Sequence, residues 1–387
     1  MDCSHVFEFK VNRLIVVFAL FLAVFSGSSV AFAQADSTGV VADSVAAVVH
    51  ADTVTSGAGH AAVHSEGEHA AGGHENEKFE PTKVIMEHIA DSHMWHLWGH
   101  TSLPLPVILY TPQGLDFFSS GQFHHGEHDY TSKYTYRLVE DKIKVVGADG
   151  HVDEAISGKV VDFSITKNVA AMFLAVLIIV VIFVSVAAAY KKRSGKAPKG
   201  LQSLIEPIII FVRDDIAKPN IGHKHARFMP YLLTVFFFIW VNNLLGLIPI
   251  FPGGANVTGN ISLTFTLSLF TMIIVNINGN KYYWKHIFLP HVPFWLWPLM
   301  VVVEVVGVVS KPFALMIRLF ANITAGHIIV LSLISLIFIF KTLAIAPVSV
   351  AFVLFMDVLE LLVAFLQAFI FTLLTALFIG MAVEEHH

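Results

Sequence analysis

The last two apolar tracts of the sequence contain very few polar side chains, and the types present suit proton transfer. The ionisable and amide side chains among them are Glu304, Lys311, Arg318, Asn322, His327, Asp357, Glu360 and Gln367. A guanidinium stays protonated at any pH that a cell reaches, and burying one at the centre of a bilayer costs roughly 2.5–3.5 kcal/mol. Folding does not require that cost, so Arg318 is predicted to serve a function.

Helical spacing predicts two polar faces on the first of these tracts. At about 100° per residue, Lys311 and Asn322 fall within about 40° of Arg318, as Glu304 does if the helix is unbroken. His327 follows nine residues after the arginine and therefore lies on the opposite face. One face carries a fixed positive charge and the other a group that titrates near neutral pH.

A second titratable group, Glu360, shares a face with Gln367 on the last tract, because the two are seven residues apart. A histidine and a desolvated glutamate can relay protons through a region of low dielectric constant. An arginine cannot, but it can act as an electrostatic barrier and as the counter-charge of a carboxylate. These tracts hold no second cluster of carboxylates, so that carboxylate is expected on another chain.

The elements that position these groups are two tracts, Pro298–Phe340 and Thr342–Val383, each about twice the twenty or so residues that cross a bilayer. Each is either two spans with a hidden turn or one long, steeply tilted helix. We favour the long helices, shielded by a neighbouring protein.

The preceding sequence predicts three near-perpendicular or shorter spans and two further segments. The predicted elements are a span at Asn168–Tyr190, an amphipathic helix at Leu201–Ile216, spans at Met229–Pro249 and Asn260–Asn278, and a short Pro- and Trp-rich piece at Leu289–Met300. The cluster Lys191, Lys192, Arg193, Lys196 and Lys199 places the first loop in the cytoplasm by the positive-inside rule.

The N-terminal third is predicted to be exported. Residues 1–33 have the basic, apolar and A-x-A segments of a cleaved signal peptide, with an uncleaved anchor as the alternative. Residues 34–80 form a flexible arm rich in His and Ala, and residues 81–165 a small irregular region. Within it, Thr82–Trp98 has helical spacing and Tyr130–Val161 alternates like strands.

Composition agrees with an all-α polytopic membrane protein. Of 387 residues, 55% are hydrophobic and 14% charged, with a mean hydropathy of +0.69. Cys3 is the only cysteine and precedes the predicted cleavage site, so no disulfide or thiolate metal site is expected. No nucleotide-binding motif and no basic block typical of nucleic-acid binding occurs.

Three sequence motifs resemble the a subunit of F-type ATP synthases over about residues 166–387. They are S-K-P-F-A-L-M-I-R-L-F-A-N-I-T-A-G-H (310–327), L-Q-A-F-I-F (366–371) and N-L-L-G-L-I-P (243–249). The resemblance implies the static part of a rotary motor in the bacterial plasma (inner) membrane, with no catalytic nucleotide site and no cofactor. It also implies partners: the c-subunit ring, the b-type peripheral stalk, the remaining subunits and lipid.

The resemblance also implies a role for each matching residue. The positions matched are Arg318 facing the ring carboxylates, Asn322 and Gln367 on the ring-facing path, His327, Glu360 and Asn243 on the half-channel from the outer side, and Glu304 on the half-channel to the cytoplasm. Asp357 and Lys311 are further candidates. Some members of the family have the acid and the histidine exchanged, and some have aspartate where this chain has Gly246.

Other hypotheses remain open from the residues alone. Most of the 21 histidines lie between His50 and His151, and His93, His96 and His100 have helical spacing. A metal-ion transporter with a metal-capturing arm is therefore the alternative function, although Arg318 would repel a cation; no metal ligand is assigned. A structural anchor for an exported domain leaves Arg318 and Glu360 unexplained. The mature N-terminus is predicted outside the cytoplasm and the C-terminus inside it.

Overall fold

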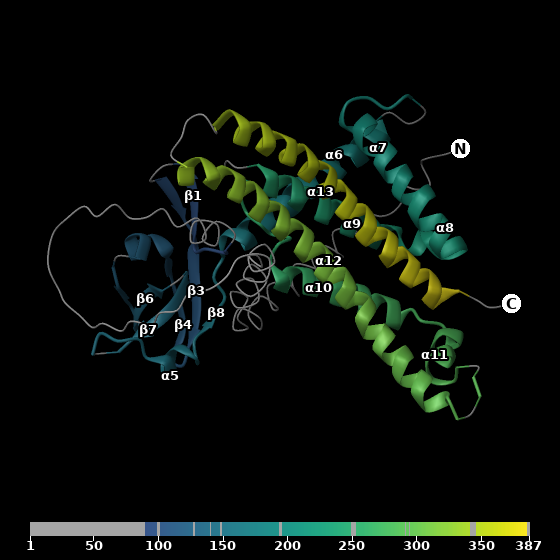
Figure 1. The fold of residues 1–387 in the computed structure, drawn as a ribbon, viewed down its shortest axis with the longest axis horizontal. Helices are drawn as coiled ribbons and strands as arrows, with labels where there is room; N and C mark the ends of the chain where they lie inside the picture. Colours follow the sequence, from purple (N-terminus) through teal and green to yellow (C-terminus); the bar gives the residue numbers. More distant parts are fainter. Residues whose placement is uncertain are drawn as a thin grey trace, which may run out of the picture.

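The computed structural model describes ten stretches of the chain. They are residues 90–98, 101–126, 128–139, 141–147, 149–192, 196–248, 253–290, 292–293, 295–340 and 346–384. The predicted signal peptide, the arm at residues 34–80 and Cys3 lie outside the described residues. The described chain divides into a strand-rich region followed by long helices (Figure 1).

The strand-rich region, residues 94–162, is called the strand domain below. Its elements are β1 (Met94–Trp98), β2 (Thr101–Pro104), β3 (Pro106–Thr111), β4 (Gly114–Ser119), η1 (Ser120–Gly126), β5 (Tyr130–Thr131), β6 (Thr135–Val139), β7 (Lys142–Val146), α5 (Glu154–Ser157) and β8 (Val161–Asp162). They pair antiparallel in three sheets, ordered β1-β2, β4-β3-β8 and β5-β6-β7. Side chains alternate between the two faces of β3 and β4, so Val107, Leu109 and Phe118 point to the same side. There they form a buried apolar core with Phe123 and Tyr136.

This region is more regular than the irregular fold expected from its sequence. The strand-like alternation predicted for Tyr130–Val161 is confirmed by β5 to β8. The helix predicted over Thr82–Trp98 is wrong at Met94–Trp98, because Trp95 pairs with Leu103 in an antiparallel ladder. A partner strand decided the conformation of this short apolar run, whose periodicity fits either structure. His96 lies in strand β1, so His93 and His96 do not share a helix face; His100 lies outside the described residues.

The helical part begins with α6 (Lys167–Lys192), which confirms the first predicted span. The remaining helices are α7 (Leu201–Phe211), η2 (Val212–Ala217), α8 (Lys218–Ile221), η3 (Gly222–Lys224), α9 (His225–Leu247), α10 (Ile261–Ile277), α11 (Lys281–Phe288), α12 (Trp297–Phe340) and α13 (Ala346–Val383). Among the described residues, four continuous helical stretches are long and apolar enough to cross a membrane. A fifth arises if α10 and α11, which meet at a bend of 103°, form one broken span.

The two C-terminal tracts are single long helices, as predicted. Helix α12 has 44 residues and α13 has 38, so their lengths are about 66 Å and 57 Å at 1.5 Å per residue. Both exceed the roughly 30 Å of a hydrocarbon core, and Pro312 does not end α12. In Figure 1 they run beside each other, with the strand domain at one end.

Helix α9 occupies the interior of the helical part. Phe236, Phe237, Phe238 and Ile239 are all buried, so the helix is covered on every side rather than along one stripe. It packs against α6 and α13. This central position brings Asn243, near the end of α9, against the two long helices.

Candidate functional site

A cavity of about 330 Å³ lies between α9, α12, α13 and the loop that precedes α10. We call it the histidine cavity. Its lining includes four of the predicted site residues: Asn243, Asn322, His327 and Glu360. The structure therefore collects side chains from three helices that are distant in sequence.

Hydrogen bonds fix Asn243 on the wall of this cavity. The Thr258 hydroxyl donates to Asn243 Oδ1 at 2.6 Å, and Asn243 Nδ2 donates to the Ala364 carbonyl oxygen at 3.2 Å. Ala364 lies one helical turn after Glu360 on α13. Both ends of the amide are thus satisfied, which orients a side chain that is only 3% exposed.

The carboxylate of Glu360 approaches α12 at a glycine. A Cβ added to Gly326 would lie 2.7 Å from Glu360 Oε1, closer than real Cβ contacts occur. That oxygen and Asn256 Nδ2 are buried, and neither has a hydrogen-bond partner within the described part of the chain. Buried polar atoms normally find partners, and the enclosed part of this cavity has room for about one water molecule.

A second cavity, of about 320 Å³, lies between α10, α11, α12 and α13. We call it the lysine cavity, because Lys311 lines it together with Thr271, Asn276 and Tyr283. The Lys311 ammonium sits 5.7 Å from the Phe378 ring centroid, a favourable cation–π geometry. The Tyr283 hydroxyl donates to Asn276 Oδ1 at 3.2 Å.

Glu304 lies two helical turns before Lys311 on α12, at the edge of this region. Its Oε1 is 3.8 Å from Nδ1 of His286 on α11. The predicted candidate for the cytoplasmic half-channel therefore has a titratable neighbour that the sequence did not suggest.

Arg318 lies on α12 between the two cavities and lines neither. Seven residues separate it from Lys311 and nine from His327, about 10 Å and 14 Å along the helix axis. Its side chain is exposed, and it makes no ion pair or hydrogen bond with the residues that the structure describes. Exposed apolar residues, including Phe313 and Ile317, surround it on the same helix.

The two remaining candidates lie outside both cavities. Gln367 is 2% exposed on α13, two turns after Glu360. Asp357 is exposed, one turn before Glu360.

Sequence reasoning missed several polar residues that line the cavities or adjoin them. Asn256 and Thr258 belong to the loop that was read only as a turn, and Asn276, Tyr283 and His286 belong to α10 and α11. The available signal was a set of polar side chains next to otherwise apolar helices. Helix α11 itself was not predicted.

The chain was compared with known proteins. A family described as "ATP synthase A chain" matches residues 169–380, and one described as "Domain of unknown function" matches residues 84–163. The protein named "ATP synthase subunit a" in Chloroherpeton thalassium is 52% identical over 233 residues, which is 58% of this chain and 69% of that relative. The protein of that name in Myxococcus xanthus is 43% identical over 58% of this chain and 75% of its own length.

Similarity to some relatives extends beyond the membrane helices. The "ATP synthase subunit a" of Chlorobium phaeobacteroides strain BS1 is 39% identical over 98% of this chain and 96% of its own length. The N-terminal region and the strand domain therefore have counterparts in that relative.

Proposed function

Because the chain belongs to the ATP synthase A chain family, we propose that it carries protons past a rotating ring of carboxylate-bearing subunits. It is the proton-translocating stator subunit of an F-type ATP synthase and a non-catalytic part of that complex. It is a multi-pass membrane protein, and in bacteria this family resides in the plasma membrane. The roles of individual residues below are part of the proposal.

The histidine cavity serves as the half-channel on the side of the strand domain. His327 and Glu360 both line it, and an imidazole beside a carboxylate can accept and release protons near neutral pH. Water is the carrier we expect to connect these groups to the aqueous phase, since Glu360 Oε1 and Asn256 Nδ2 both lack partners within the described part of the chain. Asn322 also lines the cavity and is exposed, so its amide can hydrogen-bond a water molecule that carries the proton toward the outer face of α12.

The lysine cavity serves as the half-channel on the opposite side of the membrane. It shares no lining residue with the histidine cavity, and a proton must leave one half-channel before it can enter the other. Glu304 and His286 supply titratable groups beside it.

Arg318 prevents protons from passing directly between the two half-channels. A guanidinium does not release its proton, and its charge repels a protonic defect while it attracts an ionised carboxylate. Its exposed side chain is available to a carboxylate of another chain. The ring carboxylate therefore loses its proton as it reaches Arg318.

An exposed apolar surface on α12 and α13 supports the ring as the partner. Within this chain, only 17% of the most apolar stretch of α12 is buried. The exposed residues include Val302, Val306, Val309, Phe313, Ile317, Phe352, Phe355, Leu359, Leu362 and Leu366. Because α12 and α13 are longer than the bilayer is thick, they must tilt steeply to remain within it. An apolar protein partner would cover their exposed side chains.

Topology follows the distribution of basic residues. Lys191, Lys192, Lys196 and Lys199 at the end of α6 place that end in the cytoplasm, so the strand domain is exported and the C-terminus is cytoplasmic. A b-type peripheral stalk holds the subunit against rotation. The metal-ion transporter that the histidines suggested has no support, since the relatives reported above are named as ATP synthase subunits.

The observation that carries the proposal is the position of Arg318, exposed between two separate cavities. Its test is ATP-driven proton pumping by the whole complex in vesicles, for Arg318→Ala beside Arg227→Ala. Arg227 is also exposed, but it lies in the first turn of α9. We expect Arg318→Ala to abolish pumping and Arg227→Ala to preserve it, in complexes that retain the ring. Normal pumping by Arg318→Ala would overturn the proposal.

A further inference from the structure

Trp95 connects the strand domain to the loop that borders the histidine cavity. This residue of β1 donates a hydrogen bond from Nε1 to the carbonyl oxygen of Gly253 at 3.3 Å. Trp95 is 5% exposed and belongs, with Leu105, to the same buried apolar cluster as Ala255 and Val257 of the loop. The contact therefore combines apolar burial with a buried hydrogen bond.

The loop, residues 253–260, is held between this tryptophan and the end of α9. A Cβ on Gly253 would lie 2.6 Å from both the Leu245 carbonyl oxygen and the Ile248 Cβ, so only glycine fits at this point. The loop backbone is thus pressed against α9 on one side and bound by Trp95 as well. Its position depends on both.

The same loop supplies part of the cavity wall. Ala255, Asn256 and Thr258 line the histidine cavity. Thr258 bonds to Asn243, which bonds in turn to the carbonyl oxygen of Ala364 on α13. A chain of direct contacts therefore runs from the strand domain to the helix that carries Glu360.

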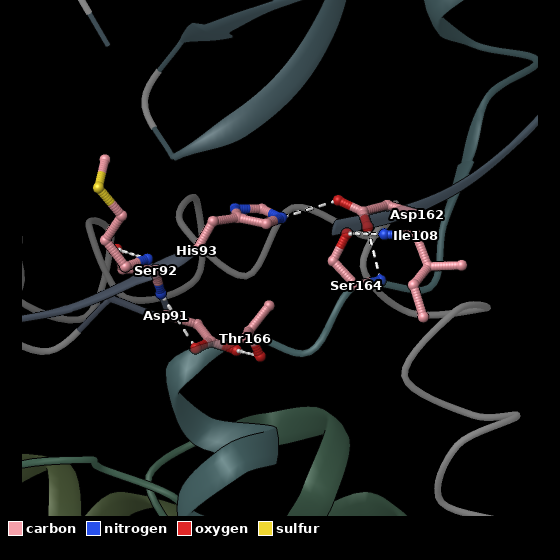
Figure 2. Close-up of polar contacts among 8 residues, drawn as sticks. Asp91, Ser92, His93, Ile108, Asp162, Ser164 and Thr166 are labelled. Carbon is pink, nitrogen blue, oxygen red and sulfur yellow. Dashed lines mark hydrogen bonds and ion pairs between the residues drawn. The ribbon is translucent and has the colours of Figure 1, made fainter. Parts of the chain in front are cut away.

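Hydrogen bonds attach the strand domain to the first membrane helix, so it can hold the loop at residues 253–260 in position. Asp91, just before β1, accepts a hydrogen bond from the Thr166 hydroxyl at 2.7 Å, next to the start of α6 (Figure 2). It also accepts one from the backbone N–H of Asn168 in the first turn of α6, at 3.0 Å. Two residues on, His93 Nε2 lies 2.9 Å from Asp162 Oδ2 of β8 (Figure 2). The segment that carries Trp95 is thereby attached both to α6 and to the rest of the strand domain.

We infer that the strand domain sets the shape of the outer mouth of the proton half-channel, with Trp95 as the positioning residue. The inference rests on the proposed function, because it assigns a role to this cavity in proton uptake. Trp95 is not among the residues that line the histidine cavity. It acts through residues 253–260, which hold Asn256, Thr258 and Asn243 around the cavity.

A positioning role and a purely structural role differ in what they alter. If Trp95 shapes the mouth, its loss changes the outer proton concentration at which transport is half-maximal. If Trp95 only stabilises the fold, its loss lowers the amount of assembled complex and the maximal rate, and leaves that concentration unchanged.

The test is ATP synthesis by the whole complex in vesicles, with the pH on the strand-domain side varied at fixed membrane potential and fixed pH on the other side. Trp95→Ala removes both the packing and the donor, and Trp95→Phe removes the donor but retains an aromatic ring. Phe117→Ala is the matched control, because it truncates an aromatic residue of the same domain that is 70% exposed.

For Trp95→Ala we expect the half-saturating proton concentration to rise roughly threefold to tenfold, the change that corresponds to one net hydrogen bond. Trp95→Phe should lie between Trp95→Ala and the parent, and Phe117→Ala should match the parent. If Trp95→Ala does not assemble, Trp95→Phe carries the test. Half-saturation equal to the parent in every assembled Trp95 variant overturns the inference.

Failure here is distinguishable from failure of the proposed function. If the half-saturating proton concentration is unchanged in the Trp95 variants while Arg318→Ala loses pumping, only the positioning role of Trp95 is rejected. Pumping that survives Arg318→Ala rejects the proposed function itself.

Discussion

Glu360 of α13 reaches α12 at Gly326, a residue without a side chain. The Cβ of an alanine there would lie 2.7 Å from the carboxylate oxygen Oε1. The atom displaced is the end of a flexible side chain, so the fold can adjust by rotating the carboxylate away. The structural change is small, but it moves the group that is proposed to carry the proton.

We therefore expect Gly326→Ala to assemble normally and to lower proton flux by roughly 10- to 100-fold, the scale of loss when a reacting group is misplaced by about 1 Å. Gly307→Ala is the matched control, since it makes the same change in the same helix and its Cβ meets no atom within 4 Å. Proton flux through vesicles with the assembled complex measures both. Equal flux in the two variants would show that the position of Glu360 does not limit transport.

His327 and Glu360 line the same cavity. Some members of the family have an acid at the position of His327 and a histidine at the position of Glu360. If the two side chains act as one relay unit, transport requires one imidazole and one carboxylate in the cavity. Which helix carries each group is then less important. The double variant His327→Glu with Glu360→His should then conduct more protons than either single variant. Equal loss in all three would show that the pair is not a relay.

Much of the membrane part could be predicted because local rules decide it. The length of the last two tracts allowed either paired spans or single long helices, and the long helices that we favoured are confirmed. His327 and Glu360 were paired by chemical type alone, and the fold brings both to the histidine cavity. Their roles in transport remain predictions.

The rest depends on contacts between distant segments. Met94–Trp98 became a strand because Thr101–Pro104 pairs with it, which periodicity in a short apolar run does not reveal. Asn256 and Thr258 resemble ordinary turn residues until Thr258 is seen to bond Asn243. Helix α11, at a 103° bend from α10, has only eight residues, too few for a helical period to stand out.

Deletion of residues 34–80 tests whether the arm is separable from transport. The contacts that join the N-terminal region to the helices in the described part of the chain begin at Asp91, with its bonds to Thr166 and Asn168. We therefore expect the deletion to leave proton flux per assembled complex within about twofold of the parent, a free-energy change below roughly 0.5 kcal/mol. Loss of flux at equal assembly would place an essential element in the arm.

The pair His93 and Asp162 predicts how the strand domain responds to pH. Burial lowers the pKa of His93, but the hydrogen bond and charge of Asp162 outweigh it, so the pKa is raised above 6.5. Burial raises the pKa of Asp162, but the bond from His93 outweighs it, so the pKa is lowered below 3.8. Both shifts favour the charged pair in the folded domain.

The sign of the pH dependence follows from these two directions. The contribution of His93 is complete below 6.5 and is lost as pH rises through its raised pKa; that of Asp162 is complete above 3.8 and is lost as pH falls through its lowered pKa. The pair therefore stabilises most between pH 3.8 and 6.5. Nearby, burial raises the pKa of Asp91 despite its hydrogen bonds from Asn168 and Thr166, and this also favours mildly acidic pH.

We expect the free energy of opening of β1 and β8 to fall by about 1 kcal/mol between pH 6 and pH 9, as a charge-assisted hydrogen bond gives way to a neutral one. Hydrogen exchange of peptides covering residues 94–98 and 161–164 in the whole complex, corrected for intrinsic rates, measures it. Asp162→Asn should flatten most of this dependence, because it removes the charge that holds the proton on His93, whereas Asp129→Asn, at an exposed pair with Arg137, should not. A parent-like pH dependence in Asp162→Asn would show that other groups set the stability of the segment that carries Trp95.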